Sequence, residues 1–209
     1  MKIAEMIAEI DVAARARSGA DLESFLEDWK AKLELPATGL DRTGRLYRHY
    51  AQYNWDRYQS VLGKYRLSDG LRRAAGKIGT PETWLFITEP WCTDAAYSLP
   101  VVQAAAASNP NIDLRMLMRD SNSDVMELFL TGTARSIPIL ATFDHLGEQR
   151  FRWGSKPKAL AESRLKLKEE GLDDRKLSLA VIEWYEAEGW LEVERELTEG
   201  LSGLEQGRP

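Results

Sequence analysis

The spacing of apolar residues changes midway along the chain, and this change limits the folds that are available. In the first 80 residues, apolar positions recur three or four apart, which is typical of amphipathic helices. Short apolar runs take over after that, at residues 84–87, 112–118, 138–143 and 149–153. Helical spacing returns between these runs. Strands that alternate with helices predict an α/β fold whose central sheet contains parallel strands.

Helix-breaking and helix-capping residues divide the chain further. Pro36 and Gly39 separate two helical stretches, and Asp41 is a predicted N-cap. The predicted helices cover residues 3–14, 22–35, 41–67, 69–78, 98–108, 122–131, 157–169 and 174–197. We therefore expect a helical extension over 1–80 packed on the core, an α/β domain over 81–170, a C-terminal helix over 171–200 and a flexible tail over 201–209.

Charge and hydropathy exclude several classes of protein. The 209 residues carry 33 acidic and 28 basic side chains, a net charge of -5, and no section is basic enough for nucleic-acid binding to be expected. No apolar run approaches the roughly 20 residues that a membrane-spanning helix needs. Acidic residues at Glu5, Glu9 and Asp11 interrupt the region where a signal peptide would be apolar. The expected compartment is the cytoplasm.

The chain has a single cysteine, Cys92, and two histidines, His49 and His145. One cysteine excludes an internal disulfide and any zinc site built on several thiolates, and two separated histidines do not suggest a metal site. We expect no metal and no cofactor. If the protein is an enzyme, Cys92 is its one thiol nucleophile.

Cys92 follows a predicted strand and lies at the start of a predicted helix. The first N–H groups of a helix are unpaired, and the helix dipole places partial positive charge there. A thiolate at this position is stabilised, so we expect an accessible thiol whose pKa can fall. The competing interpretation is a small buried core residue, because free cysteine is among the most buried residue types.

Several short segments resemble a bacterial group of thioredoxin-like proteins with a Trp-Cys-Gly-Asp-Ala-Ala type of motif. They are Asn54-Trp55-Asp56-Arg57, the run from Ile87 to Ala96, Leu99-Pro100, Arg119-Asp120, Arg135-Ser136-Ile137-Pro138 and Trp153-Gly154. The order of predicted elements also agrees with the thioredoxin superfamily. The resemblance covers roughly residues 40–200.

The resemblance implies a thioredoxin-like fold, a central mixed sheet flanked by helices, with additional N-terminal and C-terminal helices. It implies that Cys92 is the nucleophile and that Pro138 forms a cis peptide bond facing it, although only about 5–6% of X–Pro bonds are cis. The residues expected to bind substrate around Cys92 are Trp91, Thr93, Asp94, Arg135, Ile137 and Pro138.

This sequence also departs from ordinary thioredoxins. Ala95 occupies the position of the second cysteine, Phe86 that of a buried acid, and Thr93 stands where the bacterial group has glycine. Without a second thiol, the protein cannot release a mixed disulfide by itself. We expect a monothiol oxidoreductase in which glutathione or another external thiol resolves a disulfide between Cys92 and a protein or small thiol. The alternative is a redox-inactive thioredoxin-fold module that binds a protein.

Several residues keep two interpretations. Asp94 would disfavour a thiolate if it lies close to Cys92, but two residues along a helix turn it by about 200°, which would direct it away. Glu89 is either a proton carrier or a helix-entry acid. Arginines and aromatic residues alternate over 42–57, which indicates a helix with an aromatic core face rather than a single-strand binding surface. The aromatic residues of the last helix could pack in a homodimer.

Overall fold

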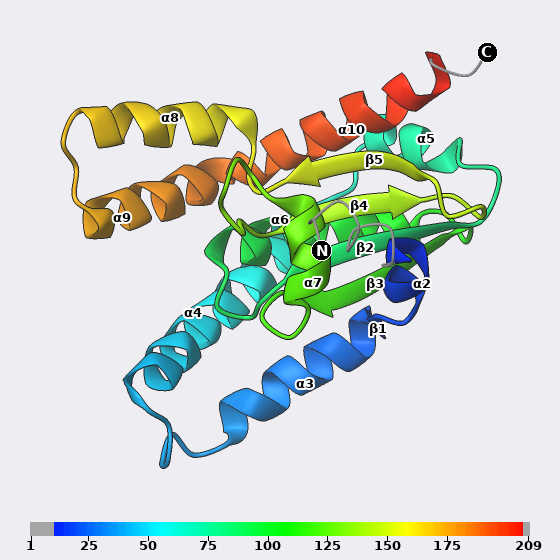
Figure 1. The fold of residues 1–209 in the computed structure, drawn as a ribbon. Helices are drawn as coiled ribbons and strands as arrows, with labels where there is room; N and C mark the ends of the chain where they lie inside the picture. The colour runs from blue at the N-terminus through cyan, green and yellow to red at the C-terminus, as the bar shows by residue number, and fades with distance from the viewer. Residues whose placement is uncertain (1–10, 207–209) are drawn as a thin grey trace.

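The structure is a computed structural model that describes residues 11–206. Its centre is a five-stranded sheet in which the strands lie in the order β1, β3, β2, β4, β5 (Figure 1). The strands are β1 (Ala20–Asp21), β2 (Glu82–Thr88), β3 (Ile112–Met118), β4 (Ile139–Phe143) and β5 (Gln149–Gly154). β2 and β3 are parallel, whereas the other neighbouring pairs are antiparallel. The predicted α/β class with a mixed sheet is confirmed.

Helices cover the sheet and extend beyond one end of it (Figure 1). They are α2 (Val12–Arg17), α3 (Leu22–Glu34), α4 (Arg42–Lys64), α5 (Asp69–Gly76), α6 (Thr93–Ala107), α7 (Ser123–Met126), α8 (Lys158–Glu169), α9 (Asp174–Trp184) and α10 (Trp190–Gln206). The carboxylates of Asp21, Asp41 and Asp173 accept backbone N–H bonds at the starts of α3, α4 and α9. The N-terminal helix α4 packs on α6, and α10 packs on α5.

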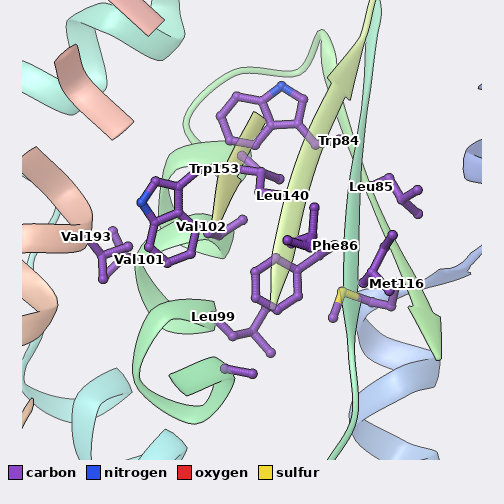
Figure 2. Close-up of a cluster of buried hydrophobic side chains, with 14 of the residues drawn as sticks. Trp84, Leu85, Phe86, Leu99, Val101, Val102, Met116, Leu140, Trp153 and Val193 are labelled. Carbon is purple, nitrogen blue, oxygen red and sulfur yellow. The ribbon is translucent and has the colours of Figure 1, made fainter. Parts of the chain in front are cut away.

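The core lies on both faces of β2, the central strand. Trp84, Leu85, Phe86 and Ile87 are all fully buried, so successive side chains fill opposite faces of the sheet. Phe86 points toward Leu99 of α6 on one side, while Leu85 lies on the other (Figure 2). Because β2 is covered on both faces, the residues that follow it have a fixed position at the carboxyl end of the sheet.

Several predicted boundaries were wrong. The helix expected over 98–108 begins earlier, at Thr93, directly after Cys92. The helix expected over 41–67 ends at Lys64, and the one expected over 122–131 is a single turn, α7, followed by a 3-10 turn at Glu127–Phe129. Most of the helix predicted over 3–14 lies outside the described residues. Of its range, residues 12–14 begin α2.

The C-terminal prediction needs two corrections. The expected continuous helix over 174–197 is broken by a kink within Tyr185–Gly189, where Ala187 and Glu188 have non-helical backbone angles and Glu188 has a φ of 64°. The ring of Trp184 fills the space beside Gly189, where a Cβ would lie 2.3 Å from it. Residues 201–206, which we expected to belong to a flexible tail, continue α10 as far as Gln206. Leu197 and Leu201, one turn apart, are buried.

Candidate functional site

Cys92 lies at the carboxyl end of β2 and is the N-cap residue of α6. Only 6% of the residue is exposed, and its Sγ–H donates a hydrogen bond to the Ile137 carbonyl oxygen at 3.3 Å. The Ile137–Pro138 peptide bond is cis, as the resemblance implied. The segment before β4 therefore lies across Cys92 and covers most of its thiol.

Burial raises the pKa of Cys92 to about 12, and the nearby carboxylate of Asp94 acts in the same direction. The backbone N–H groups of Asp94 and Ala95 lower the pKa, as expected at a helix start, and so does the Lys156 ammonium. These favourable contributions are smaller than the cost of burying a thiolate. The expectation of an accessible thiol with a lowered pKa is therefore wrong for this structure.

Asp94 lies close to Cys92 instead of pointing away from it. Its Oδ1 accepts a hydrogen bond from the Tyr185 hydroxyl at 3.0 Å, and its Oδ2 lies 3.2 Å from the Lys156 Nζ. The Asp94 side chain is 15% exposed, and this burial raises the pKa of its carboxyl group, an effect that Lys156 opposes. Two distant segments, the turn before α8 and the kink after α9, thus hold the carboxylate beside the thiol.

Trp91 forms one wall of the site. Its ring stacks on the ring of Tyr47 from α4, with the two centroids 4.8 Å apart. The Arg119 guanidinium makes a cation–π contact with the same Trp91 ring, 4.6 Å from its centroid. Arg119 also pairs with Asp120 and donates to the Arg135 carbonyl. The stacking fixes the orientation of the Trp91 ring.

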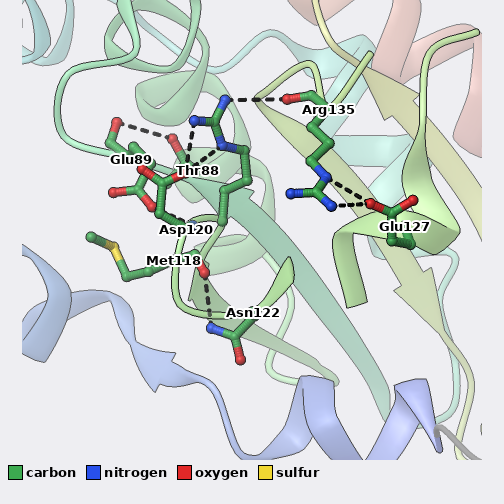
Figure 3. A network of polar contacts seen from close by, with 8 residues as sticks. Thr88, Glu89, Met118, Asp120, Asn122, Glu127 and Arg135 are labelled. Atoms are coloured by element: carbon green, nitrogen blue, oxygen red, sulfur yellow. Dashed lines mark hydrogen bonds and ion pairs between the residues drawn. The ribbon is translucent and has the colours of Figure 1, made fainter. Parts of the chain in front are cut away.

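The structure does not bring the Arg135 side chain to Cys92. The guanidinium of Arg135 pairs with Glu127 instead (Figure 3). It belongs to a separate depression of about 420 Å³. The predicted role of Arg135 in binding substrate at the thiol therefore loses its geometric basis, whereas its neighbours Ser136 and Ile137 do line the space beside Cys92.

Asn54 of α4 holds the loop that carries Cys92. It is fully buried, and its Nδ2 donates to the Pro90 carbonyl at 3.1 Å. Its Oδ1 accepts from Arg57 at 2.9 Å and from the Thr93 hydroxyl at 3.4 Å. In the sequence, Asn54 stands out only as part of a segment that resembles the bacterial group. A polar residue on the inner face of an aromatic-rich helix was the one signal that could have identified this role.

Glu89 is a second buried polar residue next to the site. Its Oε1 accepts a hydrogen bond from the Asp120 backbone N–H at 2.8 Å. Burial raises the pKa of its carboxyl group. Figure 3 places Glu89 beside Asp120, so the side chain ties the end of β2 to the turn after β3. This contact supports a structural role at the entry to α6.

These residues surround a cleft of about 700 Å³. α4 forms one side and α8 with α9 the other, and both sides extend past the same end of the sheet (Figure 1). The lining contains Tyr47, His49, Tyr50, Tyr53, Arg57, Trp91, Cys92, Thr93, Asp94, Arg119, Ser136, Ile137, Lys156, Arg164, Ser178, Val181 and Ile182. Residues 11–206 contain no cluster of side chains suited to a metal ion. The cleft has the size and mixed polarity of a ligand site.

The fold and the position of Cys92 define a thioredoxin-like protein with a single thiol. The chain belongs to the family described as Thioredoxin, whose model matches residues 43–169. No curated protein matches the sequence significantly. None of the helices in residues 11–206 is long and apolar enough to cross a membrane.

Two solved structures share the fold at low sequence identity. The first is a protein of unknown function, PA1234, from Pseudomonas aeruginosa, at 20% identity and a TM-score of 0.57, covering 88% of this chain and 93% of that one. The second is an HIV epitope scaffold, 4E10_S0, at 20% identity and a TM-score of 0.59, covering 90% of this chain and 95% of that one. At this identity the likeness supports the fold alone.

Proposed function

We propose that this protein is a thioredoxin-fold binding protein whose single thiol stays protonated at neutral pH. The observation that carries the proposal is the burial of Cys92 beside the Asp94 carboxylate, which raises the pKa of the thiol to about 12. At pH 7 such a thiol is almost entirely protonated. Thiol–disulfide exchange needs the thiolate, so Cys92 is a poor nucleophile in this conformation.

Two positions at which a dithiol reductase needs a thiol and an acid hold other residues here, which supports the same proposal. Ala95 stands where the second cysteine would be, and Phe86 is a fully buried core residue where a buried acid would be. A large cleft nevertheless opens beside Cys92. A large cleft beside a thiol that is a poor nucleophile is the arrangement expected of a binding protein.

The second candidate is monothiol exchange, which is favoured by the position of Cys92 on the cleft lining next to Ile137. In that reaction the Cys92 thiolate attacks a protein or glutathione disulfide, forms a mixed disulfide and releases one thiolate. An external thiolate such as glutathione then attacks the mixed disulfide and restores the Cys92 thiolate. Each step exchanges one S–S bond, so no other oxidant or reductant is required.

Oxidised glutathione tests the two candidates at pH 7.5. We expect the folded protein to stay unmodified while the same protein unfolded in urea gains one glutathione, because only unfolding exposes the thiol and restores an ordinary pKa. Intact-mass spectrometry gives the readout, and Cys92→Ser is the blank. Modification of the folded protein as fast as the unfolded one would contradict the proposal and support monothiol exchange.

A further inference from the structure

The side of the cleft formed by α4 presents aromatic residues that the core does not use. Tyr50 and Tyr53 lie on one face of the helix and are 44% and 51% exposed. Leu46, one turn before Tyr50, is also exposed. Tyr47, on the same helix, stacks on Trp91 and extends this surface to the floor of the cleft. Exposed aromatic rings gathered along one wall are typical of surfaces that bind a partner.

Positive charge surrounds these rings. Arg57, Arg119, Lys156 and Arg164 line the cleft, and Asp94 is the one carboxylate among the lining residues. Lys156 and Arg119 are paired with Asp94 and Asp120. Arg57 donates to the neutral amide of Asn54, and among residues 11–206 neither Arg57 nor Arg164 has its charge neutralised by an ion pair. The whole chain has a net charge of -5, so the excess of cations here is local. The cleft is therefore complementary to an acidic ligand.

The dimensions of the cleft suit a few residues of extended chain. Tyr47 and Arg57 lie ten residues apart on α4, which is about 15 Å along a helix. An extended peptide covers that length in about four or five residues. The volume of about 700 Å³ agrees with a ligand of this size.

The neighbouring arginines of α4 do not suit a nucleic acid. Arg48 donates to the Leu33 carbonyl at 2.7 Å, and Arg45 donates to the Leu40 carbonyl. Both guanidinium groups are thus held by the chain's own backbone at the start of α4. Held in this way, these two arginines do not extend the basic lining of the cleft along α4, as binding along a phosphate backbone would require.

We propose that the cleft between α4 and the α8–α9 pair binds a short acidic segment of a partner protein. Apolar side chains of the segment contact Tyr50 and Tyr53, and its carboxylates pair with Arg57 and Arg164. This inference names the ligand class of the binding function proposed above and rests on it.

The test uses a fluorescein-labelled heptapeptide that alternates Glu with Leu and Phe, and the same peptide with Gln in place of Glu. Fluorescence anisotropy measures binding at low and high salt. We expect the acidic peptide to bind with a Kd of roughly 10–100 μM, and the Gln peptide about tenfold more weakly. Higher salt weakens binding of the acidic peptide, because the ion pairs between its carboxylates and the arginines lie in an open cleft where salt screens them.

Two charge reversals on neighbouring helices form a matched pair. Arg164→Glu on α8 places a carboxylate in the cleft and is expected to weaken the acidic peptide about tenfold or more. Arg175→Glu makes the same change at an exposed residue of α9 outside the lining and is expected to leave binding unchanged. Tyr50→Ala tests the aromatic wall and should weaken both peptides.

Any of these results overturns the inference: no binding of the acidic peptide, equal binding of the Gln peptide, or equal effects of the two arginine variants. Tighter binding of a labelled eight-residue oligothymidylate than of the acidic peptide also overturns it. Peptide binding by Cys92→Ser, measured beside glutathione modification of the folded wild type, distinguishes a failure of this inference from a failure of the proposed function. If the peptide fails to bind while glutathione still does not modify the folded protein, only the ligand class is wrong. If binding requires the Cys92 thiol, the proposed function is wrong.

Discussion

Replacing Asp94 with asparagine is expected to increase the alkylation rate of Cys92 at pH 7.5 by about tenfold or more. The Asp94 carboxylate raises the pKa of Cys92, and the Lys156 ammonium lowers it. The substitution removes the negative charge and leaves Lys156 without the carboxylate that neutralises it. Both changes stabilise the thiolate and lower the pKa of Cys92, and each unit of pKa is a factor of ten in thiolate. Burial, the largest cause of the raised pKa, remains.

Removing the nearby positive charge instead of the negative one is expected to slow the alkylation of Cys92. Lys156→Met removes the cation, so the pKa of Cys92 rises further and alkylation becomes slower. Glu186→Gln is the matched control for Asp94→Asn, because Glu186 is a carboxylate that contacts Tyr97 and is not among the main causes of the raised pKa of Cys92. Iodoacetamide labelling followed by intact mass measures all three rates. Equal rates in Asp94→Asn and Glu186→Gln would contradict this account of the thiol.

Gly154→Ala is expected to destabilise the protein by about 3 kcal/mol or more. Gly154 has a φ of 123°, a conformation that residues with a side chain rarely adopt. A Cβ there would lie 2.2 Å from the Pro138 carbonyl oxygen and 3.2 Å from the Ile139 Cα. Both contacts are backbone atoms of the segment that covers Cys92. The substitution therefore forces β4 and β5 apart at the site.

Gly63→Ala is the matched control for this prediction. Gly63 lies in the last turn of α4, and nothing lies within 4 Å of the position a Cβ would take. Alanine there is expected to be neutral or to stabilise the protein by up to about 1 kcal/mol. Urea unfolding followed by circular dichroism measures both variants. A Gly154→Ala protein with a midpoint within the error of the wild type would show that this close approach is not required.

The fold was predictable because its strongest signals are local. Trp84, Leu85, Phe86 and Ile87 form a short apolar run, which is typical of a strand buried on both faces. The break at 185–189 had no comparable signal. It depends on the Trp184 ring against Gly189 and on a positive φ at Glu188, a residue that rarely adopts one. The helix over residues 198–206 was missed because the burial of Leu197 and Leu201 comes from tertiary contacts.

The sequence placed the thiol correctly but not its environment. The position of Cys92 at the start of α6 follows from neighbouring residues, and so does the helix contribution to its pKa. The burial of Cys92, by contrast, comes from the segment around Ile137, 45 residues away. Tyr185 reaches Asp94 from 91 residues away, and Asn54 reaches Pro90 from 36. Contacts over such separations leave no local pattern, so the sign of the pKa shift could not be inferred.

The pH dependence of Cys92 alkylation tests the central claim most directly, because the chain has no other cysteine. Iodoacetamide is added to the folded protein at a series of pH values, and intact mass gives the rate at each. The account predicts a rate that keeps rising beyond pH 10, in keeping with a pKa of about 12. The protein unfolded in urea serves as the reference and should show a midpoint of about 8.5. A midpoint in the folded protein below that of the unfolded one would contradict the account and identify Cys92 as a poised nucleophile.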